Sequence, residues 1–291
     1  MSLRRAICVS HDGGACVLVD RALAAAGLAV EHVRELPADT AGAVLVVADR
    51  AARRAAGDAL RAVPVPVVVV GDDLDDDGLI SLMHEAPVSH LVEDPGDRTL
   101  EVTSEKLASG DVWGLEKYLA PGARVRERVV HDGRDTRRAM DEVSAWAEAV
   151  GARSGALHRI ASVVDELLMN ALIADAAAGG AGSRRAVLRW ASDERTLAVS
   201  VLDDSGALSQ RDLIEHVRRA RLERGRPQSP LDGDEAGGAG LGLYLVLANV
   251  AGLVVNVAPG RCTEVVCLFD LAPANRRPVA RTRSLHVFAE A

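Results

Sequence analysis

The stretch "GGAGLGLYL" (residues 237–245) places four glycines within six residues and continues into the apolar segment "VLANVAGLVVNVA" (246–258). Glycines let backbone N–H groups approach phosphate oxygens, and a helix that starts there adds the partial positive charge of its N-terminus. A G-x-G-x-x-G loop is excluded because position 243 is Leu, and the chain lacks the Gly-Lys-Ser/Thr of a P-loop. By itself the stretch leaves open a phosphate-facing helix, a broken membrane segment or a turn.

A helix with two polar residues on one face is predicted upstream, over residues 155–177. Its apolar residues recur at three- and four-residue steps and form one stripe: Leu157, Ile160, Val164, Leu167 and Ala171. Glu166 and Asn170 lie one turn apart beside that stripe. Taken alone, this pair is more typical of an ordinary solvated helix edge than of a functional site.

Between that helix and the glycines, the pattern predicts strands with an acidic end. In chain order, the expected elements are a strand at 186–192, a strand within 196–208, a charged segment at 209–236, a helix at 241–251, and strands at 253–259 and 260–271. The second strand runs into Asp203-Asp204-Ser205-Gly206.

This order of elements and motifs resembles the GHKL ATPase superfamily, whose domain is an α/β-sandwich called the Bergerat fold. The N box is similar to "ELLMNA" (166–171), the D-x-G box to "DDSG" (203–206), the G-x-G-L-G-L box to "GAGLGL" (238–243) and the terminal G-x-x-T to "GRCT" (260–263). The resemblance covers residues 125–272, about half of the chain.

The resemblance implies a site for ATP and Mg²⁺. Asn170 corresponds to the Mg²⁺ ligand, since this ion prefers oxygen donors, and Glu166 corresponds to the base that accepts a proton from an attacking water or hydroxyl. The D-x-G carboxylate accepts a hydrogen bond from adenine; strand register favours Asp203 and motif spacing favours Asp204. The other residues assigned to the nucleotide are Gly206, Gly238, Gly240, Leu241, Gly242 and Thr263. The second glycine of the family's D box is absent, and Leu208 stands nearby.

Within the superfamily, the chain resembles the anti-sigma-factor serine kinases most. The helix predicted before the N box (135–155) contains no His, so the phosphoacceptor of sensor histidine kinases is missing. The resemblance implies a protein partner, such as an antagonist or a sigma-factor-like regulator. Three functions stay open: an ATP-dependent Ser/Thr kinase and partner switch, a nucleotide-binding signalling module without phosphotransfer, and a structural protein with a decayed ATP site.

The first third of the chain predicts a parallel sheet. Strands are expected at 4–10, 28–33, 42–49, 65–73 and 88–95, with helices at 15–27, 50–63 and around 78–86. This alternation resembles the flavodoxin-like receiver domain of response regulators. Asp49 stands where a phosphoacceptor would, but the Lys-Pro position reads Asp94-Pro95 and the fourth strand ends in Gly71. We expect a degenerate receiver-like scaffold; phosphorylation of Asp49 and an unrelated α/β domain are the alternatives.

The predicted organisation is therefore an α/β protein of two domains. A receiver-like domain covers 1–95, a helical connector 96–124, the ATP-binding domain 125–272 and a C-terminal tail 273–291. The tail mixes Arg with one apolar patch, and either docking on the protein or binding a partner would suit it.

Composition narrows the partners and the location. The net charge of −8 argues against nucleic acid as the main partner. No segment offers about 20 uninterrupted apolar residues, because Asn249, Gly252 and Asn256 break the best candidate, so we expect a cytoplasmic protein without a membrane segment. The cysteines, without C-x-x-C spacing, are expected to be reduced core thiols rather than disulfide or metal ligands: Cys8, Cys16, Cys262 and Cys267. A homodimer is left open.

Overall fold

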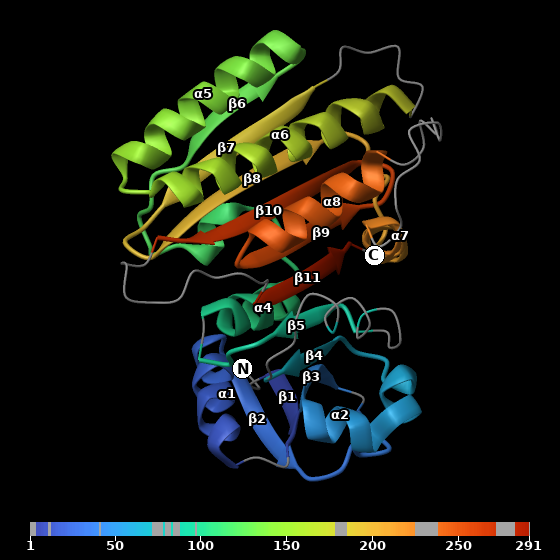
Figure 1. The fold of residues 1–291 in the computed structure, drawn as a ribbon. Helices are drawn as coiled ribbons and strands as arrows, with labels where there is room; N and C mark the ends of the chain where they lie inside the picture. Colours follow the sequence, from blue (N-terminus) through green and yellow to red (C-terminus); the bar gives the residue numbers. More distant parts are fainter. Residues whose placement is uncertain are drawn as a thin grey trace. The chain divides into compact units, whose positions relative to one another are not determined.

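The computed structural model describes residues 4–10, 13–40, 42–71, 78, 83, 88–96, 98–177, 185–224, 238–271 and 283–290. The chain divides into two compact units (Figure 1). Unit 1 comprises residues 1–113 and 283–288, and unit 2 comprises residues 114–282 and 289–291. Among the described residues, none of the helices is long and apolar enough to cross a membrane.

Unit 1 contains parallel strands in the order β2-β1-β3-β4-β5, with β11 antiparallel to β5. Its elements are β1 (Arg4–Val9), α1 (Gly13–Ala25), β2 (Leu28–Val33), β3 (Ala43–Asp49), α2 (Arg50–Ala56), η1 (Gly57–Ala62), β4 (Val67–Val70), β5 (His90–Val92), α4 (Arg98–Ser109) and β11 (Ser284–Ala289). The five predicted strands are therefore present, the last two shorter than expected. Apart from residues 78 and 83, the helix expected around 78–86 lies outside the described residues.

The core of unit 1 explains why its strands are continuous apolar runs. All of β4 and nearly all of β3 are buried. One face packs against α1 and α4 through Leu23 and Leu100, and α2 contacts β3 and β4. Both faces of such a parallel strand are buried, so its residues do not alternate between apolar and polar. The continuous apolar runs in the sequence follow from this.

The C-terminal strand β11 brings a buried polar cluster into unit 1. His286 of β11 stands opposite His90 of β5, and their ring centroids are 5.6 Å apart. Nζ of Lys106, on α4, lies 4.1 Å from the ring centroid of Phe288, although this lysine is only 1% exposed. Thr103 Oγ1 lies 3.3 Å from Nδ1 of His286. The apolar patch of the predicted tail is thus a strand that covers ionisable groups.

Unit 2 contains an antiparallel sheet in the order β9-β10-β8-β7-β6. Its elements are η2 (Leu115–Tyr118), β6 (Arg126–Val130), α5 (Gly133–Ala149), α6 (Ser154–Ala177), β7 (Ala186–Ser192), β8 (Thr196–Asp203), α7 (Gln210–Arg224), α8 (Gly238–Asn249), β9 (Gly252–Ala258) and β10 (Cys262–Asp270). The helices and strands predicted around the four motifs are present within a few residues of the expected bounds.

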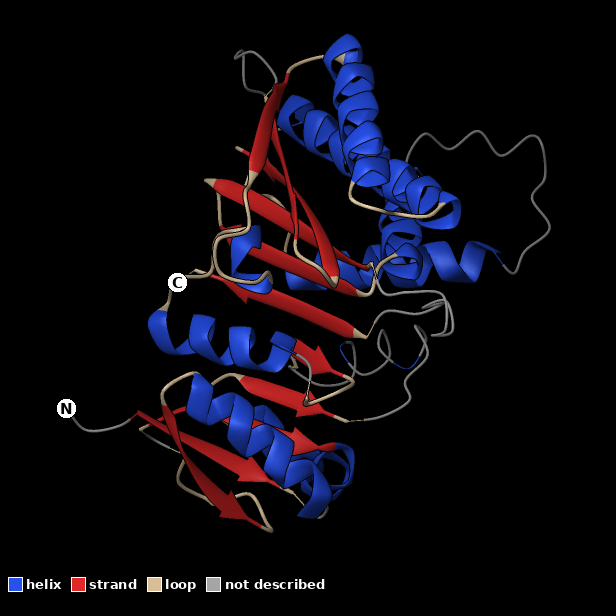
Figure 2. Cartoon of the chain, turned by 90° about the vertical axis from the view of Figure 1, so that its left-hand side faces the viewer, coloured by secondary structure: helices blue, strands red, loops and turns tan. Residues whose placement is uncertain are grey.

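Helices α5, α6 and α8 lie over one face of the unit 2 sheet (Figures 1 and 2). The register identifies the residues that point to this face. Arg128, Leu188, Val201 and Val265 stand opposite one another on four neighbouring strands, and Arg128 forms an ion pair with Glu142 of α5. Because side chains alternate between faces along a strand, every second residue from these positions faces the helices.

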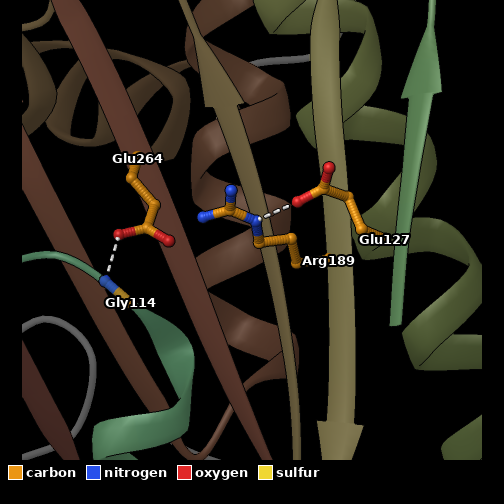
Figure 3. A network of polar contacts seen from close by, with 4 residues as sticks. All are labelled: Gly114, Glu127, Arg189 and Glu264. Carbon is orange, nitrogen blue, oxygen red and sulfur yellow. Dashed lines mark hydrogen bonds and ion pairs between the residues drawn. The ribbon is translucent and has the colours of Figure 1, made fainter. Parts of the chain in front are cut away.

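The opposite face of this sheet carries a buried carboxylate. Glu264 is 1% exposed, and its Oε2 accepts hydrogen bonds from the backbone N–H of Gly114 (3.0 Å) and from Nδ2 of Asn256 (2.9 Å). On the same face, Arg189 forms an ion pair of 2.7 Å with Glu127. Figure 3 shows this ion pair and the hydrogen bond from Gly114 to Glu264. The chain continues from Gly114 into η2, which contacts β7 and β8. The hydrogen bond from Gly114 to Glu264 therefore holds this segment against the sheet face opposite the helices.

Three described elements were absent from the sequence prediction: β6, β11 and α7. Helix α7 occupies the first half of the charged segment 209–236, and the rest of that segment, residues 225–236, lies outside the described part. Ser209 caps it, because its Oγ accepts a hydrogen bond from the backbone N–H of Asp212 (3.1 Å) and donates to the Asp212 carboxylate (2.5 Å). The structure places α4, within the predicted connector, and most of β11, within the predicted tail, in unit 1.

Candidate functional site

Helix α6 presents the first two predicted site residues. Its apolar stripe is buried from Ile160 onward, which fixes the rotation of the helix on the sheet. Glu166 and Asn170 are therefore held one turn apart at the border of the buried stripe, and both are partly exposed. Met169, between them in sequence, is 47% exposed and points away.

The glycine stretch meets these two side chains at Gly242, on the first turns of α8. A Cβ atom added at Gly242 would lie 2.2 Å from Oε2 of Glu166 and 3.6 Å from Nδ2 of Asn170. Only a residue without a side chain lets α8 approach the carboxylate this closely. Gly242 and Glu166 are thus in direct contact although they are more than 70 positions apart in the sequence, and Asn170 lies beside them.

Asp203 and Thr263 form a second group at the end of the sheet. They stand opposite each other on β8 and β10. Each is two positions from Val201 and Val265 respectively, so both face the helices. Asp203 is 8% exposed and Thr263 is 2% exposed. The register therefore puts a carboxylate and a hydroxyl side by side on the helix-covered face.

The structure separates the two candidate aspartates of the D-x-G motif. Asp203 ends β8 and is buried, whereas Asp204 follows the strand and is exposed. Oδ1 of Asp203 accepts hydrogen bonds from the backbone N–H of Ser205, at 2.8 Å, and from the Ser205 hydroxyl. These bonds orient the Asp203 carboxylate, so the geometry favours Asp203. Sequence reasoning missed Ser205, although an Asp followed two residues later by Ser is typical of such a turn.

Gly206 packs the D-x-G turn against the turn between β9 and β10. Its φ is +55°, and its carbonyl accepts a hydrogen bond from the backbone N–H of Gly260 at 3.1 Å. A Cβ at Gly206 would lie 2.3 Å from the carbonyl oxygen of Ala258 and 2.5 Å from the backbone nitrogen of Arg261. The D-x-G and G-x-x-T motifs are therefore neighbours, and glycine is required where they touch.

Gly206→Ala is expected to destabilise unit 2 by at least about 3 kcal/mol, because it adds backbone strain and overlap with backbone atoms that cannot rotate away. Gly260→Ala is the matched control: its φ is +67°, but no atom lies within 4 Å of the added Cβ, so only about 1–2 kcal/mol of strain is expected. Urea unfolding followed by circular dichroism measures both. Equal losses in the two variants would contradict the close contact at Gly206.

The predicted residues thus form two groups within the described part of the chain. Glu166 and Asn170 meet Gly242, and Asp203 meets Thr263 beside the Gly206 turn. Ala186, the first residue of β7 after α6 in the sequence, stands opposite Asp203. Gly238, Gly240 and Leu241 lie in the first turn of α8, and their side-chain surroundings fall outside the described residues.

Two buried polar atoms at these positions lack a protein partner within the described part of the chain. They are Nδ2 of Asn170 and Oγ1 of Thr263. A buried polar atom without a hydrogen bond costs roughly 1–3 kcal/mol, so such atoms commonly mark a place where a ligand or water binds. An amide, a hydroxyl and two carboxylates, with glycine backbone close by, form a donor set that fits a nucleotide and an oxygen-preferring cation.

Burial raises the pKa of Glu166 above its ordinary value, and the neighbouring charge of Asp165 adds to the shift. The raised pKa means that ionising this carboxyl is less favourable in the folded protein than in the unfolded chain. Such a carboxyl is better suited to accept a proton near neutral pH than an unperturbed glutamate.

Glu166→Gln is expected to stabilise unit 2 at neutral pH and to have no such effect in acid. The unfolded chain ionises Glu166 at its ordinary pKa, and the folded chain only above its raised pKa. Stability is therefore lost as pH rises through that window, and Gln removes the loss. Urea midpoints of wild type and variant across pH measure the difference, with Asp141→Asn, an exposed carboxylate on α5, as control. A variant that is less stable than wild type at neutral pH would contradict the shift.

The side chain of Asp49, in unit 1, is held by hydrogen bonds within the protein. Its Oδ1 accepts a hydrogen bond from the backbone N–H of Ala52 at 2.7 Å, which caps α2, and its Oδ2 accepts one from the hydroxyl of Ser10 at 2.7 Å. The side chain is 8% exposed. Both carboxylate oxygens are therefore engaged within the protein.

Comparisons with known proteins give little guidance. No family model matches the chain, and no curated protein matches it. Among solved structures, a match is found to a chain in the crystal structure of the SiaB-SiaC complex from Pseudomonas aeruginosa, with 14% sequence identity, a TM-score of 0.36, and coverage of 50% of this chain and 88% of that chain.

Proposed function

We propose that unit 2 is a GHKL-type domain of Bergerat fold that binds Mg²⁺ and ATP, and that the protein is a cytoplasmic signalling kinase for a Ser or Thr of a partner protein. The observation that carries the proposal is the close approach of Gly242 to the Glu166 carboxylate, with the Asn170 amide within 3.6 Å of a Cβ placed at Gly242. It joins the predicted phosphate-facing glycines to the predicted metal ligand and base. The pairing of Asp203 with Thr263 supports an adenine position where β8 ends beside β10.

Each residue has a role that its chemistry suits. The side-chain oxygen of Asn170 would hold Mg²⁺, and the carboxylate of Asp203 would accept a hydrogen bond from the adenine amino group, beside Thr263. Backbone N–H groups at the start of α8 would bind phosphate oxygens. Bound ATP and Mg²⁺ would supply the phosphoryl group and the neutralisation of its charge. Glu166 would take the proton of the attacking hydroxyl, for which its raised pKa is favourable.

We propose that unit 1 is a receiver-like scaffold of flavodoxin type. The strand order β2-β1-β3-β4-β5 is the order of that fold. Asp49 occupies the acceptor position, but it caps α2 and binds Ser10. In this proposal unit 1 receives a signal by contact with other proteins rather than by phosphorylation of Asp49.

Phosphoryl transfer from γ-labelled ATP tests the kinase proposal. The full-length protein, with partners that co-purify from the native cell, is incubated with label and Mg²⁺, and the labelled bond is tested for acid stability. We expect an acid-stable label on a partner, which is typical of phosphoserine or phosphothreonine, and its loss with Glu166→Gln. Binding of Mg·ATP without any transfer would leave a nucleotide-binding module, and the absence of binding would overturn the proposal.

A further inference from the structure

A cluster of metal-binding side chains lies in unit 1 and is built from residues other than those of the candidate nucleotide site. The two thiol sulfurs of Cys8 and Cys16 and a ring nitrogen of His32 all lie within 4.8 Å of one another. No disulfide joins the cysteines. The separation of the three atoms is close to what neighbouring ligands of one tetrahedral ion require.

The fold builds this cluster from three elements. Cys8 on β1 stands directly opposite His32 on the neighbouring parallel strand β2, so both side chains leave the sheet on the same face. Helix α1 covers that face and contacts β1 and β2. Cys16 lies on this helix, and Asp20 follows it by one turn, so both project from the same side of α1.

The fourth residue supports the histidine. Nε2 of His32 lies 2.6 Å from Oδ1 of Asp20. A carboxylate bonded to one ring nitrogen fixes the tautomer and the orientation of an imidazole, and this arrangement accompanies histidines that bind metals. The His32 side chain is 41% exposed and that of Asp20 is 46% exposed, whereas Cys8 is buried. The cluster therefore has a closed inner side and an outer side open to solvent.

We propose that Cys8, Cys16 and His32 bind a thiophilic divalent cation, Zn²⁺ first among them, with Asp20 orienting His32. Two sulfurs and one nitrogen are the donors that such cations select, and three protein ligands leave one coordination position for water or an exogenous ligand. Cation binding releases the thiol protons.

Co²⁺ and Zn²⁺ titration of the reduced, tag-free, full-length protein tests the site. We expect one equivalent of Co²⁺ to give thiolate-to-cobalt absorption with the intense visible bands of tetrahedral coordination, and Zn²⁺ to displace it. Cys16→Ser and His32→Gln change partly exposed positions and should weaken binding at least 100-fold. Asp20→Asn should weaken it about 10–100-fold.

Cys262→Ser is the matched control, because Cys262 is also partly exposed but belongs to unit 2. Its binding should equal that of wild type. Absence of metal uptake by the reduced wild type, or equal uptake by Cys16→Ser, would overturn the proposal. So would a Cys8–Cys16 disulfide that forms in air while the reduced protein takes up no metal, since the cluster would then be a redox pair.

Discussion

Asn170→Ala should weaken Mg²⁺-dependent nucleotide binding at least about 100-fold, because loss of even an outer-shell partner of a metal costs about 10–100-fold. Glu166→Gln should leave binding within a few-fold of wild type and slow phosphoryl transfer by about 10²–10⁴, the usual contribution of a general base. The two residues lie on one face of α6, one turn apart. Anisotropy of a fluorescent ATP analogue measures binding, and transfer of γ-label measures turnover.

Two neighbouring substitutions make this prediction specific. Met169 lies between the two positions on α6 but is 47% exposed. Met169→Ala should therefore change neither nucleotide binding nor phosphoryl transfer. Gly242→Ala puts a Cβ 2.2 Å from Oε2 of Glu166, and this flexible carboxylate can rotate away. The fold should therefore survive while transfer falls as in Glu166→Gln. Unchanged nucleotide affinity in Asn170→Ala would contradict the assignment of the site.

Unit 1 should lose stability steeply as pH falls below about 6.5. Burial lowers the pKa of His90 to about 3 and that of His286 well below its ordinary value, and the charge of Lys106 contributes to both shifts. A lowered histidine pKa favours the neutral folded form, so this stability is present above the unfolded pKa and lost as pH falls below it. Two histidines should together cost about 4 kcal/mol between pH 7 and pH 5.

Urea unfolding with pulse hydrogen exchange, read by mass spectrometry, separates unit 1 from unit 2. Peptides from β5 and β11 should become unprotected at lower urea as pH falls, while peptides from β8 and β10 shift less. His286→Gln should remove about half of the pH dependence, because one titrating group is gone. His158→Gln, at an exposed position of α6, should leave it unchanged. A urea midpoint of β5 that is flat from pH 7 to 5 would contradict the mechanism.

Periodicity was sufficient to predict most of the elements. The helix that carries Glu166 and Asn170 was expected at 155–177 and is found at Ser154–Ala177. The prediction succeeded because apolar residues at three- and four-residue steps lie on one face of a helix, and that face is buried. The β7 strand matches its prediction residue for residue. The order of the motifs also placed Glu166, Asn170 and Gly242 in one hypothesis, and the structure brings these three together.

Contacts across the sequence could not be predicted from local patterns. The β11 strand seemed to be a tail because one short apolar patch carries no information about its partner, and pairing with β5 depends on tertiary structure. Helix α7 was not predicted, because its many charged residues made 209–236 look like a charged connecting segment. Ser209 and Asp212 nevertheless form a recognisable N-terminal cap. Strand register in the sequence already favoured Asp203 over Asp204, and the structure adds that Asp203 is buried whereas Asp204 is exposed. The spacing of Cys8, Cys16 and His32 gives no motif, because two strands and a helix assemble them.

Calorimetric titration of the full-length protein with ATP, in the presence of Mg²⁺ and then of a chelator, tests the central claim most directly. We predict one saturable ATP site per chain that requires Mg²⁺ and disappears in Asn170→Ala. No binding of ATP, or binding that is independent of both Mg²⁺ and Asn170, would contradict the claim that unit 2 is a Mg·ATP-binding domain.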